Sequence, residues 1–436
     1  MDEPSRPESS QLTAEMKYHL LLQISEKISG TLELGEVLNQ LVDTVRSVVA
    51  YDAAGIFVLK ERVRLLAQDR ETNLIAGMAL RGFDIRSAGR DPMLSSGKGI
   101  VGYAIRTGQS VIVPDVRRDL RYVEGRKETL SEVTVPIVIH DEVIGALNLE
   151  SNRLGVYTHE DVEVLQFFAN AAANSIEKAL LHNRLIETRR IENQLKIARE
   201  VQTSLLPDRP PDLPGYDIAA INIPTWEISG DCYDYIEFPG GQVGIAIADV
   251  SGKGVPAALI MATFRAALRA QVRNDVELSH IMQSVNRLLC ESIGRSAFVT
   301  AVYGTLIPES GRFTYTNAGH NPPLLLVNAK PCTRLDCGGP ALGVIDNASY
   351  DVGVVMLEPG DTLALYTDGV VEVTGREQAE FGIELLERTL RKASDRSAEE
   401  TLRMVIEQTQ AFSGTSIYPD DFTIVIAKRT ALTGKR

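Results

Sequence analysis

The stretch Val-Gly-Ile-Ala-Ile-Ala-Asp-Val-Ser-Gly-Lys-Gly, residues 243–254, joins an apolar run to a glycine-rich turn through one aspartate, Asp249. The apolar run predicts a buried strand, and the glycines allow backbone or solvent to approach the carboxylate closely. An aspartate at an expected strand end also occurs in three other segments, which are Ser229-Gly-Asp-Cys-Tyr-Asp-Tyr235, Tyr366-Thr-Asp-Gly369 and Pro419-Asp-Asp-Phe-Thr423. We therefore expect these four segments to organise the C-terminal half of the chain.

The chemistry of the four segments favours a hard divalent cation. Each segment alone is most often a turn, but all four in one domain predict a metal site. Carboxylate and carbonyl oxygens suit Mg²⁺ or Mn²⁺, and several aspartates at one site would repel one another without cations between them, which indicates two ions. Zn²⁺ is disfavoured because the four Cys lack zinc-site spacing. Two such ions activate a water and stabilise an in-line displacement at phosphorus.

The composition describes an acidic, ordinary globular protein. The 436 residues include 45 Lys and Arg against 58 Asp and Glu, a net charge of −13, which argues against electrostatic binding of nucleic acid. A hydrophobic content of 44% excludes global disorder. No apolar run approaches a membrane span and the N-terminus has no signal pattern, so with few Cys we expect a cytoplasmic location.

The N-terminal half predicts an α+β domain. Residues 1–11 form a polar tail, and residues 12–180 combine helical patterns up to about Val49, short strand-like runs and a helix that starts at Thr158. The expected strands are Ala53–Leu59, Val63–Ala67, Leu74–Leu80, Ser110–Pro114, Val133–His140 and Val143–Leu149.

A long helix follows, because no Pro or Gly interrupts the chain from Thr158 to Leu206. Residues 181–206 are charged, yet apolar residues recur every three or four positions. They predict either a surface helix docked on one domain or a linker that pairs with a second copy as a coiled coil, and we favour the pairing. The proline-rich stretch Pro207–Pro214 marks a boundary.

Residues 207–430 predict a second α+β domain with two antiparallel sheets packed face to face, and residues 431–436 a tail. Its expected strands are Ile218–Ile223, Val243–Asp249, Phe298–Ile307, Phe313–Ala318, Pro323–Val327, Val352–Leu357, Thr362–Tyr366 and Phe422–Ala427. Its expected helices cover residues 256–273, 277–293, 380–392 and 397–412.

From about Ile191 to Arg429 the chain resembles the bacterial metal-dependent protein phosphatases of the sporulation-protein-E and sigma-factor-regulator type, within the PPM superfamily. The four aspartate segments carry the resemblance, together with Ala198–Gln202, Ser204–Pro207 and Ala318-Gly-His-Asn-Pro-Pro323. The resemblance implies that Asp231, Asp249 and the carbonyl of Val250 hold one metal ion or bridge both, and that Asp368 and Asp420 hold the other. A metal-bridging water would attack the phosphorus of a phosphoserine or phosphothreonine. Mn²⁺ or Mg²⁺ would be the two ions.

Other residues of these motifs are expected to have supporting roles. Asp234 is an outer-shell or third-metal candidate, and Asp421 is expected to support the last strand. Lys253 reads as a solvated turn residue that could touch the phosphate, and His320 as a residue that orders its loop. Ser229 stands where the family often has Gly.

The N-terminal domain resembles a GAF sensor domain. The matching segments are Gly97–Ala104, Thr107–Asp115, Ser131–Pro136, Val143–Glu150 and Leu165–Ala172. The resemblance implies a fold but no particular ligand. Because no Cys occurs in residues 1–231, covalent attachment of a bilin is disfavoured, and His140 reads as an ordinary histidine.

The sequence thus predicts a GAF-regulated serine/threonine protein phosphatase. By resemblance, its substrate would be a phosphorylated anti-sigma-factor antagonist or a similar partner, with an unknown small-molecule or protein signal at the GAF domain and a homodimer formed through the linker helix. Two alternatives remain. Ser-Gly-Asp superficially resembles the diguanylate cyclase motif, although Cys232-Tyr233 replaces Glu-Phe and a cyclase leaves Asp368 and Asp420 unexplained. A non-catalytic sensor or scaffold is the other.

Overall fold

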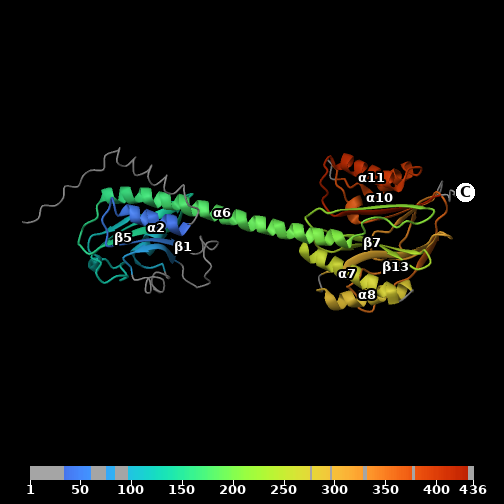
Figure 1. Cartoon of the computed structure of the whole chain (residues 1–436), viewed down its shortest axis with the longest axis horizontal. Helices are drawn as coiled ribbons and strands as arrows, with labels where there is room; N and C mark the ends of the chain where they lie inside the picture. The colour runs from blue at the N-terminus through green and yellow to red at the C-terminus, as the bar shows by residue number, and fades with distance from the viewer. Residues whose placement is uncertain are drawn as a thin grey trace, which may run out of the picture. The chain divides into compact units, whose positions relative to one another are not determined.

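The computed structural model describes residues 34–59, 75–83, 97–274, 277–294, 297–327, 331–375 and 379–430. The chain divides into two compact units between Ile191 and Glu192 (Figure 1). No helix of the described residues is long and apolar enough to cross a membrane.

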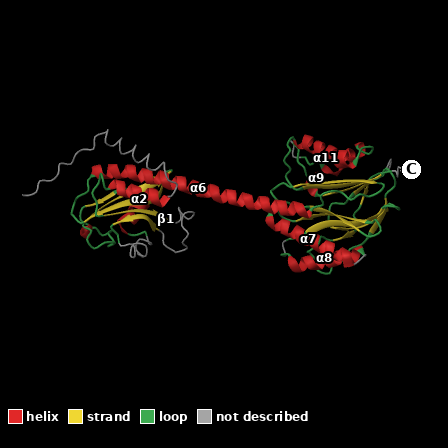
Figure 2. Ribbon diagram, in the orientation of Figure 1, coloured by secondary structure: helices red, strands yellow, loops and turns green. Residues whose placement is uncertain are grey.

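Unit 1 is a five-stranded antiparallel sheet with the strand order β2-β1-β5-β4-β3 and helices on both faces (Figure 2). One face packs against α2, Leu34–Val45, and against the first part of α6, His159–Leu205. The other face packs against α5, Gly99–Thr107. The strands are β1 Ala53–Leu59, β2 Ile75–Arg81, β3 Val111–Val113, β4 Ser131–Ile139 and β5 Glu142–Ser151.

Unit 2 contains two sheets that enclose a common apolar core. The first sheet has the order β13-β10-β9-β8-β7, with β14 also paired to β10, and the second has the order β12-β11-β15-β16-β6. The first comprises β7 Cys232–Glu237, β8 Val243–Val250, β9 Val299–Ile307, β10 Arg312–Ala318, β13 Gly338–Gly339 and β14 Gly353–Met356. The second comprises β6 Tyr216–Ile223, β11 Leu324–Leu326, β12 Thr333–Arg334, β15 Thr362–Tyr366 and β16 Phe422–Arg429.

Helices cover the outer face of each sheet of unit 2, so that four layers result (Figure 2). On the first sheet lie α7, Val255–Asn274, and α8, Leu278–Ser292. On the second lie α9, Asp368–Val371, α10, Gly382–Lys392, and α11, Ala398–Ser413. The predicted α+β class with two facing sheets is confirmed.

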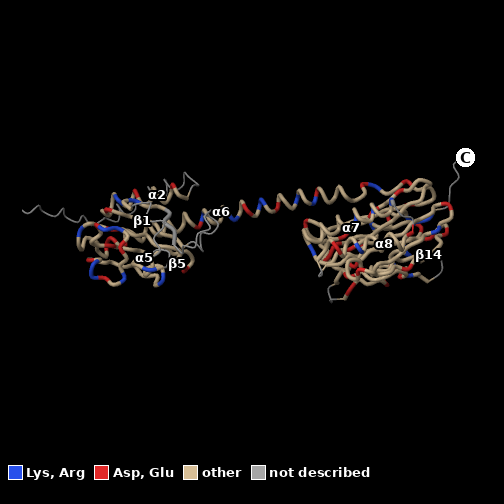
Figure 3. The backbone as a smooth tube through the Cα atoms, turned by 90° about the horizontal axis from the view of Figure 1, so that it is seen from below, with Lys and Arg blue, Asp and Glu red and all other residues tan. Residues whose placement is uncertain are grey.

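Helix α6 contributes to both units. Its first part buries Leu165, Phe168 and Ile176 in the core of unit 1, and near its C-terminus Gln202 is buried in unit 2. The Thr158 hydroxyl accepts from the N–H of Asp161, and the Asp161 carboxylate accepts from the N–H of Thr158, so a capping box is present at the start of α6. Basic and acidic residues alternate along the middle of the helix, as Figure 3 shows.

Most expected elements are found within a few residues of their predicted limits, but the structure also has elements that were not expected, among them α5, β7 and α9. Helix α5 was not expected because its glycines obscure the apolar period, yet Gly102 is required there, since a Cβ would lie 2.0 Å from the Gly97 carbonyl oxygen. Strand β7 contains the Cys-Tyr-Asp of an aspartate segment, and Asp368 begins the short helix α9. The expected strand Val63–Ala67 and residues 12–33 lie outside the described residues.

Candidate metal centre

The four aspartates come from strand ends of the two facing sheets. Asp249 is the second-last residue of β8. Asp231 directly precedes β7, whose Cys232 pairs with Ala248. In the second sheet Asp368 follows β15 and Asp420 precedes β16, and these two strands are paired from Tyr366 and Ile424 onward. The topology therefore brings four segments that are far apart in the chain to one edge of the two-sheet core.

Asp231 and Asp249 are the most enclosed pair. Asp231 is only 2% exposed, and its Oδ2 accepts a hydrogen bond of 2.7 Å from the Thr367 hydroxyl. Burial, and next the charge of Asp249, raise the pKa of Asp231 well above its usual range. Burial and the neighbouring charge of Asp368 raise the pKa of Asp249 to about 7, and a hydrogen bond with Asp231 opposes that rise.

Asp368 and Asp420 complete the group from the second sheet. Burial, followed by the charge of Asp420, raises the pKa of Asp368. Lys253 Nζ lies 3.0 Å from Asp420 Oδ2 and donates a 3.1 Å hydrogen bond to the Pro419 carbonyl. The expected solvated turn residue Lys253 therefore has a carboxylate partner from this group.

The donor set fits a hard divalent cation. Within the described ranges, no three His, Cys, Asp or Glu side chains already converge as a ready metal site. The carboxylates of Asp231 and Asp420 are bonded to Thr367 and Lys253 instead. Burial, and next the charge of a neighbouring aspartate of the group, raises the pKa of Asp231, Asp249 and Asp368. Bound cations would relieve the repulsion between these carboxylates.

Two glycines of the motifs lie in close contact with backbone beside the aspartates. A Cβ on Gly230 would lie 3.2 Å from the carbonyl oxygen of Val250, the carbonyl expected to bind metal. A Cβ on Gly369 would lie 2.0 Å from the carbonyl oxygen of Asp421. A side chain at either position would displace the backbone that holds Asp231 or Asp368.

Asp421 holds the loop that leads to Asp231. Its Oδ1 accepts from the Thr225 N–H at 2.8 Å, and its Oδ2 accepts from the Ser229 hydroxyl at 2.8 Å and the Gly230 N–H at 2.7 Å. The Ser229 hydroxyl in turn accepts from the N–H of Asp231 at 3.0 Å. The Ser229 hydroxyl thus links Asp421 to Asp231. A Gly, which the family often has at this position, could not form this link.

Asp234 is turned toward α7. Its carboxylate is 2% exposed and accepts two hydrogen bonds from Arg269, at 2.6 and 2.7 Å, while Arg265 Nε lies at 3.0 Å. The expected outer-shell or third-metal role is not supported, because both oxygens are occupied by guanidinium groups. Asp234 instead ties β7 to α7.

His320 joins three segments. Its ring Nδ1 lies 2.8 Å from the Thr300 hydroxyl, and its ring Nε2 lies 3.1 Å from the Tyr366 carbonyl. Its backbone N–H donates to Asn317 Oδ1 at 2.7 Å. Burial lowers the pKa of His320 to about 4. These contacts are those of a neutral residue that orders the loop before β11. In unit 1, His140 is an exposed turn residue.

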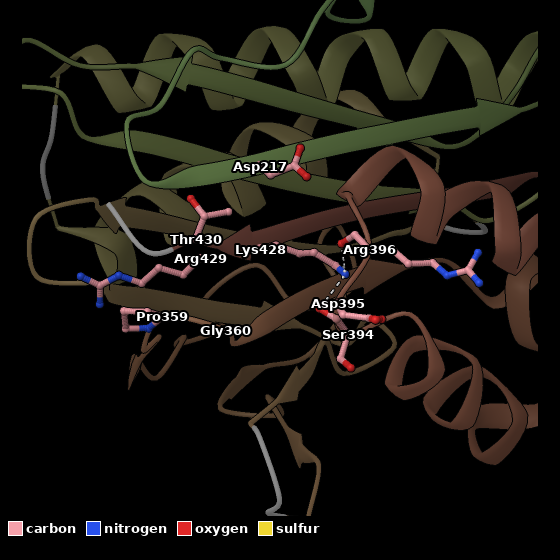
Figure 4. A pocket seen from close by; sticks show the side chains of 9 residues that line it. All are labelled: Asp217, Pro359, Gly360, Ser394, Asp395, Arg396, Lys428, Arg429 and Thr430. Carbon is pink, nitrogen blue, oxygen red and sulfur yellow. Dashed lines mark hydrogen bonds between the residues drawn. The ribbon is translucent and has the colours of Figure 1, made fainter. Parts of the chain in front are cut away.

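A cavity of about 370 Å³ lies elsewhere on unit 2 and includes none of the four aspartates (Figure 4). Its buried Lys428 donates to the carbonyls of Ala393, Ser394 and Arg396, in the turn between α10 and α11. Because these carbonyls satisfy the ammonium, Lys428 has a structural role.

Sequence reasoning missed three residues that shape the centre: Thr367, Ser229 as a hydrogen-bond donor, and Gln202. Gln202 lies in the lead-in Ala198–Gln202 noted above, and being polar on a helix it gave no signal of burial.

Comparison with family models identifies both units. Residues 239–430 match the model described as Stage II sporulation protein E, and residues 31–177 match the GAF domain model.

Known proteins are similar to parts of the chain. The chain is 30% identical over 241 residues to phosphoserine phosphatase RsbU of Bacillus subtilis (strain 168), covering 55% of this chain and 71% of the relative. It is 26% identical to phosphoserine phosphatase RsbP of the same organism, covering 42% of this chain and 46% of that protein, so it spans less than half of RsbP. The solved SiaA-PP2C domain of Pseudomonas aeruginosa is 22% identical, with a TM-score of 0.51 over 56% of this chain and 99% of that chain, a likeness of fold.

Proposed function

The chain belongs to the family of phosphoserine phosphatase RsbU, a family of SpoIIE-type serine/threonine phosphatases, and from this relationship we propose that Asp231, Asp249, Asp368 and Asp420 form its metal centre. The observation that carries the proposal is that four aspartates lie at strand ends on one edge of the two sheets, and that burial and a neighbouring carboxylate raise the pKa of three of them. Such repulsion is costly unless cations bind there.

The proposed ligands divide by sheet. Asp231, Asp249 and the Val250 carbonyl hold one ion, and Asp368 and Asp420 hold the second, with Mn²⁺ or Mg²⁺ as the metal because all donors are oxygens. When bound, these ions would supply an activated water and offset the charge of the phosphate. The Thr367 hydroxyl orients Asp231, and Asp421 holds the backbone on either side of Ser229.

The substrate we propose is a phosphoserine or phosphothreonine of a partner protein, in particular an anti-sigma-factor antagonist or a similar signalling protein. The names of the relatives support the phosphoserine, and the domain composition supports a signalling role. We further propose that the protein is cytoplasmic and that the GAF domain receives a small-molecule or protein signal.

A homodimer through α6 is part of the proposal. Apolar side chains on the helix are exposed in the single chain, among them Leu181 at 57%, Ile191 at 48% and Ile197 at 60%. A second copy of the helix would cover such residues in a coiled coil.

The test is Mn²⁺-dependent hydrolysis of p-nitrophenyl phosphate by the full chain and by Asp249→Asn and Asp368→Asn. We expect both variants to lose more than about a hundredfold in rate, since each removes a charge from the centre. The matched control is Asp336→Asn at an exposed aspartate of unit 2, which should keep the wild-type rate. Wild-type rates in both centre variants would exclude these ligands, and cyclic or linked guanylate or adenylate products from a nucleoside triphosphate would favour a cyclase.

A further inference from the structure

The side chain of Gln202 makes a two-point contact with one residue of the loop before Asp231. Its Nε2 donates to the Ser229 carbonyl at 2.7 Å, and its Oε1 accepts from the Ser229 N–H at 2.9 Å. Gln202 is 9% exposed, whereas its neighbour Val201 on α6 is 59% exposed. The end of an otherwise exposed helix segment is therefore fastened to the backbone of Ser229.

Ser229 contacts Asp231, one of the proposed metal ligands. Its hydroxyl accepts from the N–H of Asp231 and donates to the carboxylate of Asp421, and its side chain is 2% exposed. Gln202 holds the backbone of Ser229 while Asp421 holds its hydroxyl and the next N–H, that of Gly230. The loop before Asp231 is thus held by Gln202 from α6 and by Asp421 from just before β16, while the Thr367 hydroxyl holds the Asp231 carboxylate.

The geometry of this contact makes it a sensitive one. A primary amide matches the N–H and C=O of a single residue only at one distance and orientation, because both bonds must be near 2.9 Å at once. A shift or rotation of α6 by about 1 Å would break one bond or both, and would leave buried backbone groups without partners. The loop would then move, and Asp231 with it.

We propose that Gln202 is a positioning residue through which the end of α6 sets the orientation of Asp231, and so the affinity of the centre for divalent cations. The inference rests on the proposed function, because it assumes that Asp231 is a metal ligand. Gln202 itself touches neither metal nor substrate. The contact gives α6, which also contributes to the core of the GAF unit, a direct connection to the catalytic chemistry.

The experiment measures Mn²⁺ binding to the metal-free full chain by titration calorimetry, together with p-nitrophenyl phosphate hydrolysis over a range of Mn²⁺ concentrations. Gln202→Ala removes both bonds, and Gln202→Glu retains the acceptor for the Ser229 N–H while losing the donor. Gln194→Ala is the matched control, since Gln194 is an exposed glutamine on the same helix. Thermal unfolding identifies any variant that fails to fold.

We expect Gln202→Ala to raise the Mn²⁺ dissociation constant about tenfold, the loss that corresponds to one or two net hydrogen bonds. At saturating Mn²⁺ its kcat should stay within about twofold of wild type, because the residues that react are unchanged. Gln202→Glu should weaken Mn²⁺ binding as well, and Gln194→Ala should not. A split between metal affinity and kcat is a result that a merely stabilising residue would not produce.

Wild-type Mn²⁺ affinity in a folded Gln202→Ala or Gln202→Glu protein would overturn the inference. Asp249→Asn, measured in parallel, separates this outcome from a failure of the proposed function. If Asp249→Asn loses Mn²⁺ binding and the Gln202 variants do not, only the inference fails. If Asp249→Asn binds Mn²⁺ as well as wild type, the proposed centre itself is wrong.

Discussion

The ammonium group of Lys253 lies 3.0 Å from the carboxylate of Asp420, a residue that we assign to the metal centre. Both side chains are partly exposed, at 44% and 39%, so their mutual attraction is weak and easily exchanged. Lys253 and a divalent cation cannot both neutralise the same carboxylate oxygen. Lys253 therefore competes with a metal ion for the Asp420 carboxylate.

Replacement of Lys253 should strengthen metal binding. We expect Lys253→Met to lower the Mn²⁺ concentration for half-maximal p-nitrophenyl phosphate hydrolysis by about threefold, as an exposed ion pair of this kind implies. Lys392→Met, at an exposed lysine of α10, is the control. An unchanged metal requirement with a raised KM for the phosphate ester would instead assign Lys253 to phosphate binding.

Loss of the Asp421 carboxylate should destabilise unit 2. Asp421→Ala removes the acceptor of three hydrogen bonds, two of them from backbone N–H groups, and should reduce the free energy of unfolding by about 2–4 kcal/mol. Urea unfolding monitored by circular dichroism measures this change, with Asp336→Ala as the control. Surface substitutions usually change the free energy of unfolding by less than about 0.5 kcal/mol. A loss no larger than this in Asp421→Ala would mean that other contacts hold the loop.

Substitution of Asp234 should affect stability but not metal affinity. Asp234→Asn leaves Arg265 and Arg269 without their shared carboxylate, which we expect to cost about 2–4 kcal/mol in the free energy of unfolding. Mn²⁺ binding by the folded variant should stay within about threefold of wild type, since both carboxylate oxygens face α7. Loss of a bound ion in calorimetry would restore Asp234 as a metal ligand.

His320 should make stability fall in mild acid. The folded pKa of His320 is about 4, below the value of about 6.5 for an unfolded chain, so between these values the unfolded state binds the extra proton. This contribution is complete above pH 6.5 and is lost as the pH falls toward 4, by about 2 kcal/mol at pH 5. Urea unfolding at pH 7.5 and 5.0 should show that His320→Gln lacks this component. An identical pH dependence in both proteins would contradict it.

The phase of α6 should matter if the helix transmits a signal. Each helical residue turns the chain by about 100°, so two residues inserted before Glu192 turn its C-terminal part by about 200°, and four by about 40° beyond one turn. We expect the two-residue insertion to alter basal phosphatase activity by more than the four-residue insertion. Equal, wild-type activity and unchanged signal response in both would exclude a rigid connection through α6.

The pattern of apolar residues predicted most of the strands and helices because burial on one face imposes a period that survives in a single sequence. Helix α5 was missed because Gly99 and Gly102 interrupt that period, although close packing against Gly97 demands them. Strand β7 was missed because its polar residues pair with β8 through backbone bonds, which leave no trace in side-chain character.

The chain alone determined which residues carry the chemistry: four aspartates at strand ends, with glycines beside three of them, in two α+β domains. Only the tertiary structure decided how these residues are used, because hydrogen bonds join segments that are far apart in the sequence. In the folded chain the Asp234 carboxylate accepts a hydrogen bond from Arg269, Asp421 binds the loop before Asp231, and Gln202 binds the backbone of Ser229. A carboxylate's role follows from the donors that surround it, and those donors come together only when the two sheets pack.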